Sequence, residues 1–132
     1  CKPVPVEITY GLERLCMFVQ GKNNVFDLDW NNEGVKYKEV FFQAEKEFSA
    51  YNFEFANTDS LLKNFENTEN ECKSLLEKNL SLPAYDQCLK ASHIFNLLDA
   101  RGVIGVAERT GYITRIRELA KGCGALWLSS QS

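Results

Sequence analysis

The chain changes its pattern within one stretch of nine residues, Val6-Glu7-Ile8-Thr9-Tyr10-Gly11-Leu12-Glu13-Arg14. In the first half, apolar and polar side chains alternate, which is the period-two pattern of a β-strand with two unlike faces. From Leu12 onward the apolar residues recur at steps of three and four, which is helical spacing. Gly11 stands between the two patterns, where a glycine lets a strand turn tightly into a helix. The stretch therefore predicts a strand, a turn and a helix.

Three polar side chains of this stretch suit a binding site. Glu7 and Thr9 are two residues apart, so they are expected on one face of the strand, and Arg14 is expected in the first turn of the helix. Carboxylates bind ammonium groups, and guanidinium groups bind phosphates. The pattern therefore predicts that the three side chains converge near one point. The alternatives are ordinary strand polarity for Glu7 and Thr9, and a surface arginine paired with Glu7 or Glu13.

The strand–turn–helix pattern resembles the third signature motif of class II aminoacyl-tRNA synthetases. More closely, Pro3-Val4 and the run from Glu7 to Arg14 resemble the alpha subunit of bacterial heterotetrameric glycyl-tRNA synthetase. A second stretch resembles the C-terminal helical region of the same subunit, and it comprises residues 82–86, residues 91–102 and Glu108-Arg109. The two stretches occur in the family's order, and the resemblance covers essentially all 132 residues.

The resemblance implies a glycine–tRNA ligase subunit, which activates glycine with ATP to glycyl-adenylate and transfers glycine to tRNA(Gly). It implies that Arg14 is a catalytic residue that binds the ATP phosphates, and that Glu7 and Thr9 line the glycine pocket. ATP is then a substrate, and Mg²⁺ is expected to accompany it on ligands outside this chain. We expect no metal ligands among the residues of the chain itself.

The resemblance also implies partners and a compartment. The partners are a beta subunit, tRNA(Gly) and a second alpha subunit, which form an α2β2 tetramer. The expected location is the cytoplasm. No apolar run approaches the length of a membrane-spanning helix.

Two further motifs of the family's catalytic domain precede this stretch, one for dimerisation and one with another ATP-binding arginine. Neither occurs in these 132 residues, which open with Cys1-Lys2-Pro3 and no initiating methionine. We therefore expect the C-terminal part of the subunit, inactive by itself. Residues 1–37 are expected to end the catalytic domain, and residues 38–132 to form a C-terminal helical bundle.

The predicted fold class is mainly α, with the strand–turn–helix followed by about four helices in an antiparallel bundle. Helical spacing begins near Lys38, and helix boundaries are indicated by Thr58 or Asp59 as an N-cap, by Pro83 and by Gly102. Two apolar stripes are expected to pack in the core of this bundle, and they comprise Phe41, Ala44, Phe48, Tyr51 and Phe55 in one helix, and Ile113, Ile116, Ala120, Cys123 and Trp127 in another. The acidic run 66–71 is expected on a solvated surface.

Charge and cysteine content limit the classes of function. The net charge of −3 argues against non-specific nucleic-acid binding, although residues 101–132 carry five basic and two acidic side chains. That basic end is open to two interpretations, a solvated helix face or contact with a phosphate backbone or an acidic partner. An odd number of cysteines without a CxxC pair argues against zinc and redox motifs. We expect reduced core thiols at Cys16, Cys72, Cys88 and Cys123.

Other candidate residues leave alternatives open. His93 is the only histidine and lies on a helix of core character, so we interpret it as structural. Asp99 and Arg101 near the helix end suit capping or interhelical pairing, or else contact with a partner subunit or tRNA. At the level of the whole chain, the alternatives to a catalytic part are a helical interaction module for a partner subunit or tRNA, and a helical adaptor unrelated to synthetases.

Overall fold

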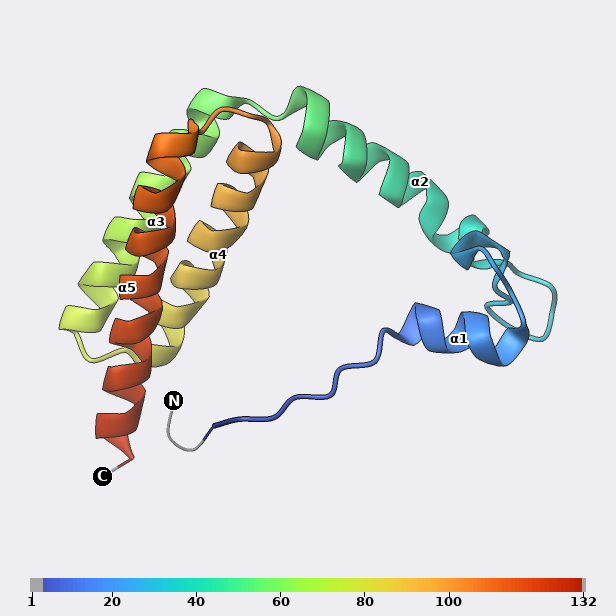
Figure 1. The fold of residues 1–132 in the computed structure, drawn as a ribbon, viewed down its shortest axis with the longest axis horizontal. Coiled ribbons are helices and arrows are strands. Elements are labelled where there is room, and N and C mark those ends of the chain that lie inside the picture. Colours follow the sequence, from blue (N-terminus) through green and yellow to red (C-terminus); the bar gives the residue numbers. More distant parts are fainter. Residues whose placement is uncertain (1–3, 132) are drawn as a thin grey trace. The chain divides into compact units, whose positions relative to one another are not determined.

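The computed structural model describes residues 4–131, and these residues are mainly helical. The chain divides into two compact units, residues 1–49 and residues 50–132. Cys1 and Pro3 lie outside the described residues. The elements are α1 (Leu12–Gln20), a 3-10 turn (Val25–Asp27), α2 (Tyr37–Ala50), a π-helical turn (Tyr51–Phe55), α3 (Thr58–Glu77), α4 (Ser81–Ala100) and α5 (Val106–Ser130), as Figure 1 shows.

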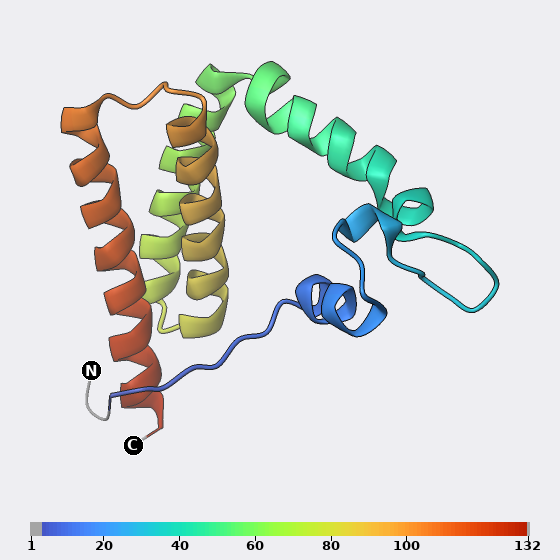
Figure 2. The same ribbon diagram turned by 45° about the vertical axis from the view of Figure 1, so that its right-hand side comes forward.

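The second unit is built on an antiparallel bundle of α3, α4 and α5, which lie side by side in both ribbon views (Figures 1 and 2). Short connections between long helices force neighbouring helices to run in opposite directions. One end of the core is formed by side chains that include Leu61 and Phe65 of α3 and Phe95 and Leu98 of α4. The other end contains Cys72, Ala84, Cys88, Leu119 and Cys123. The predicted antiparallel bundle is therefore present, with three helices where we expected about four.

The two core stripes predicted from spacing have different outcomes. On α5, Ile113, Ile116 and Cys123 pack in the core as predicted. Ala120 and Trp127 of the same stripe are exposed, which contradicts the prediction for them.

In the other stripe, Phe48 is 66% exposed, which contradicts the expectation that it packs in the bundle. Its stripe neighbours Ala44, Tyr51 and Phe55 are exposed as well. Helical spacing identifies which residues share a face, and it does not determine whether another segment covers that face. By contrast, Phe95 is only 6% exposed.

Helix boundaries in this unit follow local chemistry. Gly102 ends α4 with φ +68°, a left-handed conformation that favours glycine, and Pro83 lies in the first turn of α4, both as predicted. The N-cap of α3 is Asn57, one residue before the predicted position, and its side chain accepts a hydrogen bond from the Ser60 N–H at 2.9 Å. On α5, Gly122 allows a close approach, because an added Cβ would lie 2.9 Å from Leu76 Cδ1.

An ion pair inside the bundle joins α3 to α5. Glu69 is only 6% exposed, which contradicts the solvated surface predicted for the acidic run. Its carboxylate accepts hydrogen bonds from Arg115, whose Nε lies 3.1 Å from Oε1, and a further bond from Lys73 at 3.0 Å. The Arg115 guanidinium also lies 4.7 Å from the ring centroid of Phe65 and 5.1 Å from that of Tyr112. Burial of this carboxylate is therefore compensated by charge and by hydrogen bonds.

The stability of the bundle is expected to fall at acid pH in a way that depends on Glu69. Hydrogen bonds from Arg115 lower the pKa of Glu69, partial burial opposes them, and Lys73 lowers the pKa further. Because the folded-state pKa lies below the unfolded value, the contribution is present above the unfolded pKa and is lost as pH falls through the folded pKa. Urea unfolding of Glu69→Gln should show a weaker acid dependence than the wild type, and a loss of about 1–3 kcal/mol at pH 7.

Asp86→Asn is the matched control, because the Lys90–Asp86 pair on α4 is exposed. Its change should stay within about 0.5 kcal/mol. Equal acid dependence of Glu69→Gln and the wild type below pH 5 would contradict the role of this ion pair.

The first unit is organised by a loop between α1 and α2. The Gln20 side chain holds the loop at Asp29, since it accepts from the Asp29 N–H at 2.8 Å and donates to its carbonyl at 3.1 Å. The loop returns through an antiparallel bridge between Asp29 and Lys36. The Asn31 side chain accepts from the N–H groups of Glu33 and Val35, and Gly34 has φ +90°. These contacts form a tight turn at residues 31–34, where asparagine and glycine are favoured.

Residues 4–10 form no regular secondary structure, and their side chains are exposed. A strand is defined by its hydrogen bonds to a neighbouring strand, and no segment among residues 4–131 pairs with this one. The strand of the strand–turn–helix pattern therefore stays a prediction. The domain division after residue 37 also stays a prediction.

Candidate functional site

Arg14 is the third residue of α1, so it lies in the first turn, as predicted. The first backbone hydrogen bond of this helix runs from the Leu15 N–H to the Gly11 carbonyl at 3.0 Å. Gly11 offers no side chain to cap the preceding N–H groups. A helix N-terminus with free N–H groups attracts anions, and here it carries a guanidinium.

Gly11 acts differently from the expectation. Its φ of −73° and ψ of 122° are open to any residue, so the turn does not need the freedom of glycine. A Cβ at this position would instead lie 3.8 Å from Cγ and Cδ of Arg14. This is an ordinary van der Waals distance, so space does not require glycine at this position either.

Glu7 and Thr9 are brought together in the structure. The Thr9 hydroxyl donates a hydrogen bond to Glu7 Oε1, and both residues are exposed. A residue spacing of two places them on the same side of the extended segment, as the alternation predicts. A carboxylate also accepts hydrogen bonds from ammonium groups, so the pair has the chemistry of an ammonium site.

The structure connects Glu7 with Thr9, and it records no contact between either of them and the Arg14 side chain. Within residues 4–131, the Arg14 guanidinium has no ion pair with Glu7 or Glu13. The site therefore comprises two separate parts, a carboxylate with a hydroxyl and a guanidinium at a helix start, on one continuous segment of residues 7–14.

A comparison with known protein families adds a finding that covers the complete sequence. The family model described as glycyl-tRNA synthetase alpha subunit matches residues 1–132. The chain belongs to this family. The match supports glycine–tRNA ligase function, which is that of an aminoacyl-tRNA synthetase in protein biosynthesis. Membership of the glycyl-tRNA synthetase alpha subunit family implies ATP as a substrate, and glycine, tRNA and a beta subunit as partners.

The residues near the end of α4 have structural partners in this alpha-subunit chain. Arg109 Nε donates to both carboxylate oxygens of Asp99, at 3.2 and 3.1 Å, so this pair joins α5 to α4. Arg101 Nη1 donates to the Ala56 carbonyl at 2.7 Å and thereby holds the start of the bundle. These contacts match the capping and pairing interpretation. His93 is exposed, which contradicts a place in the core.

The cysteines behave largely as predicted. Cys72, Cys88 and Cys123 are buried free thiols from three different helices. Burial raises the pKa of Cys72 to about 12, and the neighbouring Cys123 adds to the effect. Burial raises the pKa of Cys88 as well. Such thiols stay protonated and are poor nucleophiles. Cys16 is free but exposed, in contrast to the predicted core position.

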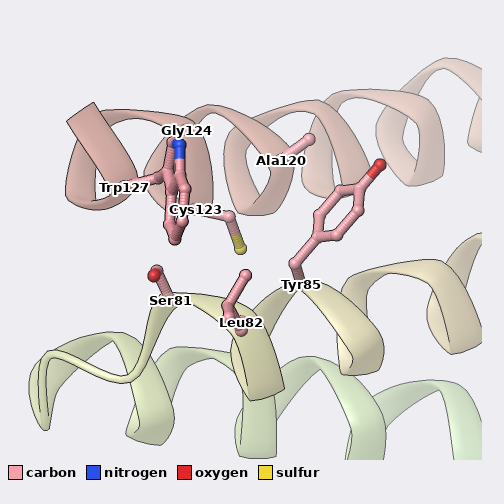
Figure 3. Close-up of a pocket in the computed structure, with 7 residues that line it drawn as sticks. All are labelled: Ser81, Leu82, Tyr85, Ala120, Cys123, Gly124 and Trp127. Carbon is pink, nitrogen blue, oxygen red and sulfur yellow. The ribbon is translucent and has the colours of Figure 1, made fainter. Parts of the chain in front are cut away.

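A pocket of about 290 Å³ lies between α4 and α5 near the C-terminal end of α5. Figure 3 shows the Cys123 sulfur directed from α5 toward Leu82 and Tyr85 of α4, with the Trp127 ring beside it. Leu82 is 65% exposed and Trp127 is 45% exposed, so apolar surface borders the pocket. Sequence spacing assigned Trp127 to the core stripe and did not indicate this opening.

Proposed function

We propose that residues 7–14 contribute the glycine- and ATP-binding groups of glycine activation in the assembled synthetase. The observation that carries the proposal is the hydrogen-bonded Glu7–Thr9 pair on the segment that leads into the α1 N-terminus with Arg14. Membership of the family over the whole chain supports the same reaction.

In the proposed reaction, the glycine carboxylate oxygen attacks the α-phosphorus of ATP. The bond from that phosphorus to the bridging oxygen breaks, and pyrophosphate leaves. Glu7 holds the glycine ammonium, and Thr9 orients the Glu7 carboxylate through its hydroxyl. Arg14 stabilises the negative charge that develops on the phosphate oxygens, together with the N–H groups at the start of α1. A hydroxyl at the 3′ end of tRNA(Gly) then attacks the glycyl carbonyl carbon and forms an ester. The acyl–phosphate bond breaks, and AMP leaves.

The same proposal includes the class of the catalytic domain, the compartment and the oligomeric state. The segment would be the strand–turn–helix of a class II catalytic domain, and the subunit would act in the cytoplasm as one of the two alpha subunits of an α2β2 tetramer. Any Mg²⁺ would arrive with ATP. Within the described part of the chain, no group of three or more His, Cys, Asp or Glu side chains is placed to hold a metal ion. No helix among residues 4–131 is long and apolar enough to cross a membrane.

The proposal assigns the glycine ammonium to Glu7, so Glu7→Gln should raise the KM for glycine. Loss of one charge-assisted hydrogen bond is worth about 1.5–3 kcal/mol, which corresponds to roughly 10–100-fold in KM. The KM for ATP should change much less, because the Glu7 carboxylate does not contact the nucleotide. The measurement is glycine-dependent ATP–pyrophosphate exchange by the assembled alpha–beta enzyme, with glycine and ATP varied separately.

Glu33→Gln serves as the control, since it removes a carboxylate from the loop of the same unit without touching residues 7–14. It should leave both constants unchanged. If Glu7→Gln and Glu33→Gln gave the same KM for glycine, Glu7 would have no role in glycine binding.

We also propose that these 132 residues alone do not activate glycine. The support is the absence from the sequence of the second ATP-binding arginine and of the dimer-forming motif. Purified chain, without other subunits, should give no glycine-dependent pyrophosphate exchange above the buffer blank.

The interaction-module function remains a second candidate for residues 50–132. The apolar pocket between α4 and α5 favours it, because Leu82, Tyr85 and Trp127 expose apolar surface there. The partner would be the beta subunit that the family implies. This candidate and the catalytic proposal concern different residues, so both can hold for one chain.

A further inference from the structure

A second hollow, of about 540 Å³, lies within the first unit, between α1, the loop at residues 28–30 and one face of α2. Three aromatic rings form its wall. The ring centroids of Trp30 and Phe41 are 5.2 Å apart with an interplanar angle of 74°, and those of Tyr37 and Phe41 are 4.7 Å apart. Tyr37 and Phe41 are four residues apart on α2, so their rings share one helix face. Trp30 remains 54% exposed, so part of its ring surface is free for a ligand.

Carboxylates border the aromatic wall on opposite elements. Glu13 comes from the first turn of α1, and Glu45 continues the α2 face one turn beyond Phe41. Neither of them forms an ion pair among residues 4–131. The third carboxylate, Asp29, is already paired with Lys36 and, at 3.9 Å, with Lys22. The hollow therefore combines aromatic ring faces with two uncompensated negative charges.

The negative charges of Glu13 and Glu45 also affect the pKa of the Tyr37 hydroxyl. Partial burial raises the pKa of Tyr37, and the negative charges of Glu13 and Glu45 raise it further. A group that gains positive charge or donates hydrogen bonds is favoured in such surroundings, and an anion is disfavoured.

From the aromatic wall and the two unpaired carboxylates, we propose that this hollow binds an arginine side chain of a partner protein. A guanidinium is flat and weakly hydrated, so it stacks on aromatic rings and donates to carboxylates at its edge. Glu13 and Glu45 are the edge acceptors, and Trp30 is the stacking surface. This inference does not depend on the roles proposed for Glu7, Thr9 and Arg14.

Nucleic acid is the other macromolecule that stacks on aromatic side chains. Binding of a strand also needs basic groups that neutralise phosphates. The described residues that line this hollow include no lysine or arginine. Lys22 and Lys36 pair with Asp29 at its border, and the unpaired charges are negative. A protein partner that presents arginine therefore fits the charge of the hollow, and an RNA strand does not.

The test uses the fluorescence of Trp30 as a direct reporter. The chain contains two tryptophans, so Trp127→Phe leaves Trp30 as the only one. This chain is titrated with acetyl-Gly-Arg-Gly-amide and, separately, with the same peptide in which neutral citrulline replaces arginine. We expect a saturable change with the arginine peptide in the low millimolar range, and at least tenfold weaker binding of the citrulline peptide.

Charge-removing variants on the same background complete the experiment. Glu13→Gln and Glu45→Gln should each weaken arginine binding several-fold, and circular dichroism verifies that each variant is folded. Glu47→Gln is the matched control, because it removes a carboxylate from α2 that does not line the hollow, and it should bind like the parent. Equal binding of the arginine and citrulline peptides, unchanged binding in both glutamine variants, or a saturable response to a single-stranded oligoribonucleotide would overturn the proposal.

Discussion

Arg14→Lys in the assembled alpha–beta enzyme is expected to lower the rate of glycine-dependent ATP–pyrophosphate exchange by roughly 10²–10³, a loss of about 2.7–4 kcal/mol in transition-state stabilisation. Lysine keeps the positive charge but not the planar pair of donors that matches phosphate oxygens. Arg14 is exposed, so the substitution should leave the fold intact. The loss should therefore appear in the rate and not in the melting temperature.

The control for this experiment is Arg117→Lys, an equivalent change at an exposed position of α5. It should leave the exchange rate within about twofold of the wild type, since surface changes typically alter free energies by less than about 0.5 kcal/mol. Near wild-type exchange in Arg14→Lys, with unchanged melting temperature, would remove Arg14 from the catalytic site.

The second large effect is expected on stability. Phe95→Ala should destabilise the bundle by about 3–5 kcal/mol, because the ring is removed from a packed core and the space is only partly refilled. Phe95 is 6% exposed, and its ring stacks on Tyr112 with centroids 6.0 Å apart and an interplanar angle of 22°. The free energy of unfolding is measured by urea denaturation, followed by helical circular dichroism, of the 132-residue chain. Phe95→Leu should lie between the wild type and Phe95→Ala.

Phe48→Ala is the matched control, since the residue type is the same and Phe48 is 66% exposed. Its effect should stay within about 0.5 kcal/mol. A loss of several kcal/mol in Phe48→Ala, or none in Phe95→Ala, would contradict the packing of the bundle.

Local signals in the sequence predicted much of the helical region. Gly102 and Pro83 indicated a helix end and a helix start, because their backbone preferences act within one or two residues. The N-cap of α3 was predicted one residue too late, since Asn57, Thr58 and Asp59 are all good capping residues and only the structure selects among them. The strand at residues 6–10 depends on a partner segment, which no local pattern can supply.

Burial was the harder quantity to predict. Phe48 and Phe95 are both phenylalanines on helical stripes, and only contact with other helices distinguishes the exposed one from the buried one. Glu69 was expected in solvent because it belongs to an acidic run, but Arg115 lies 46 positions later and supplies the compensating charge. The contact between Arg115 of α5 and Glu69 of α3 depends on how the helices pack in the bundle. The spacing of residues within either helix does not predict it.

In the candidate site, too, local features were predicted from the sequence, and contacts between distant segments were not. The hydrogen bond between Glu7 and Thr9 follows from their spacing of two residues, and the place of Arg14 follows from where helical spacing begins. The aromatic hollow was not predicted, because Trp30 belongs to a loop, and Glu13 and Glu45 belong to different helices. Aromatic residues from a loop and a helix become one wall only when the loop closes at Asp29 and Lys36.

The central claim is that Glu7 and Arg14 contact opposite ends of one glycyl-adenylate, and its most direct test is a calorimetric binding measurement on the assembled enzyme. The ligands are the non-hydrolysable adenylate analogue glycyl-sulfamoyl adenosine and its acetyl counterpart, which lacks the ammonium group. We predict that Glu7→Gln weakens binding of the glycyl analogue at least tenfold and leaves binding of the acetyl analogue unchanged, whereas Arg14→Lys weakens both by the same factor. Wild-type affinity of both variants for the glycyl analogue would contradict the account.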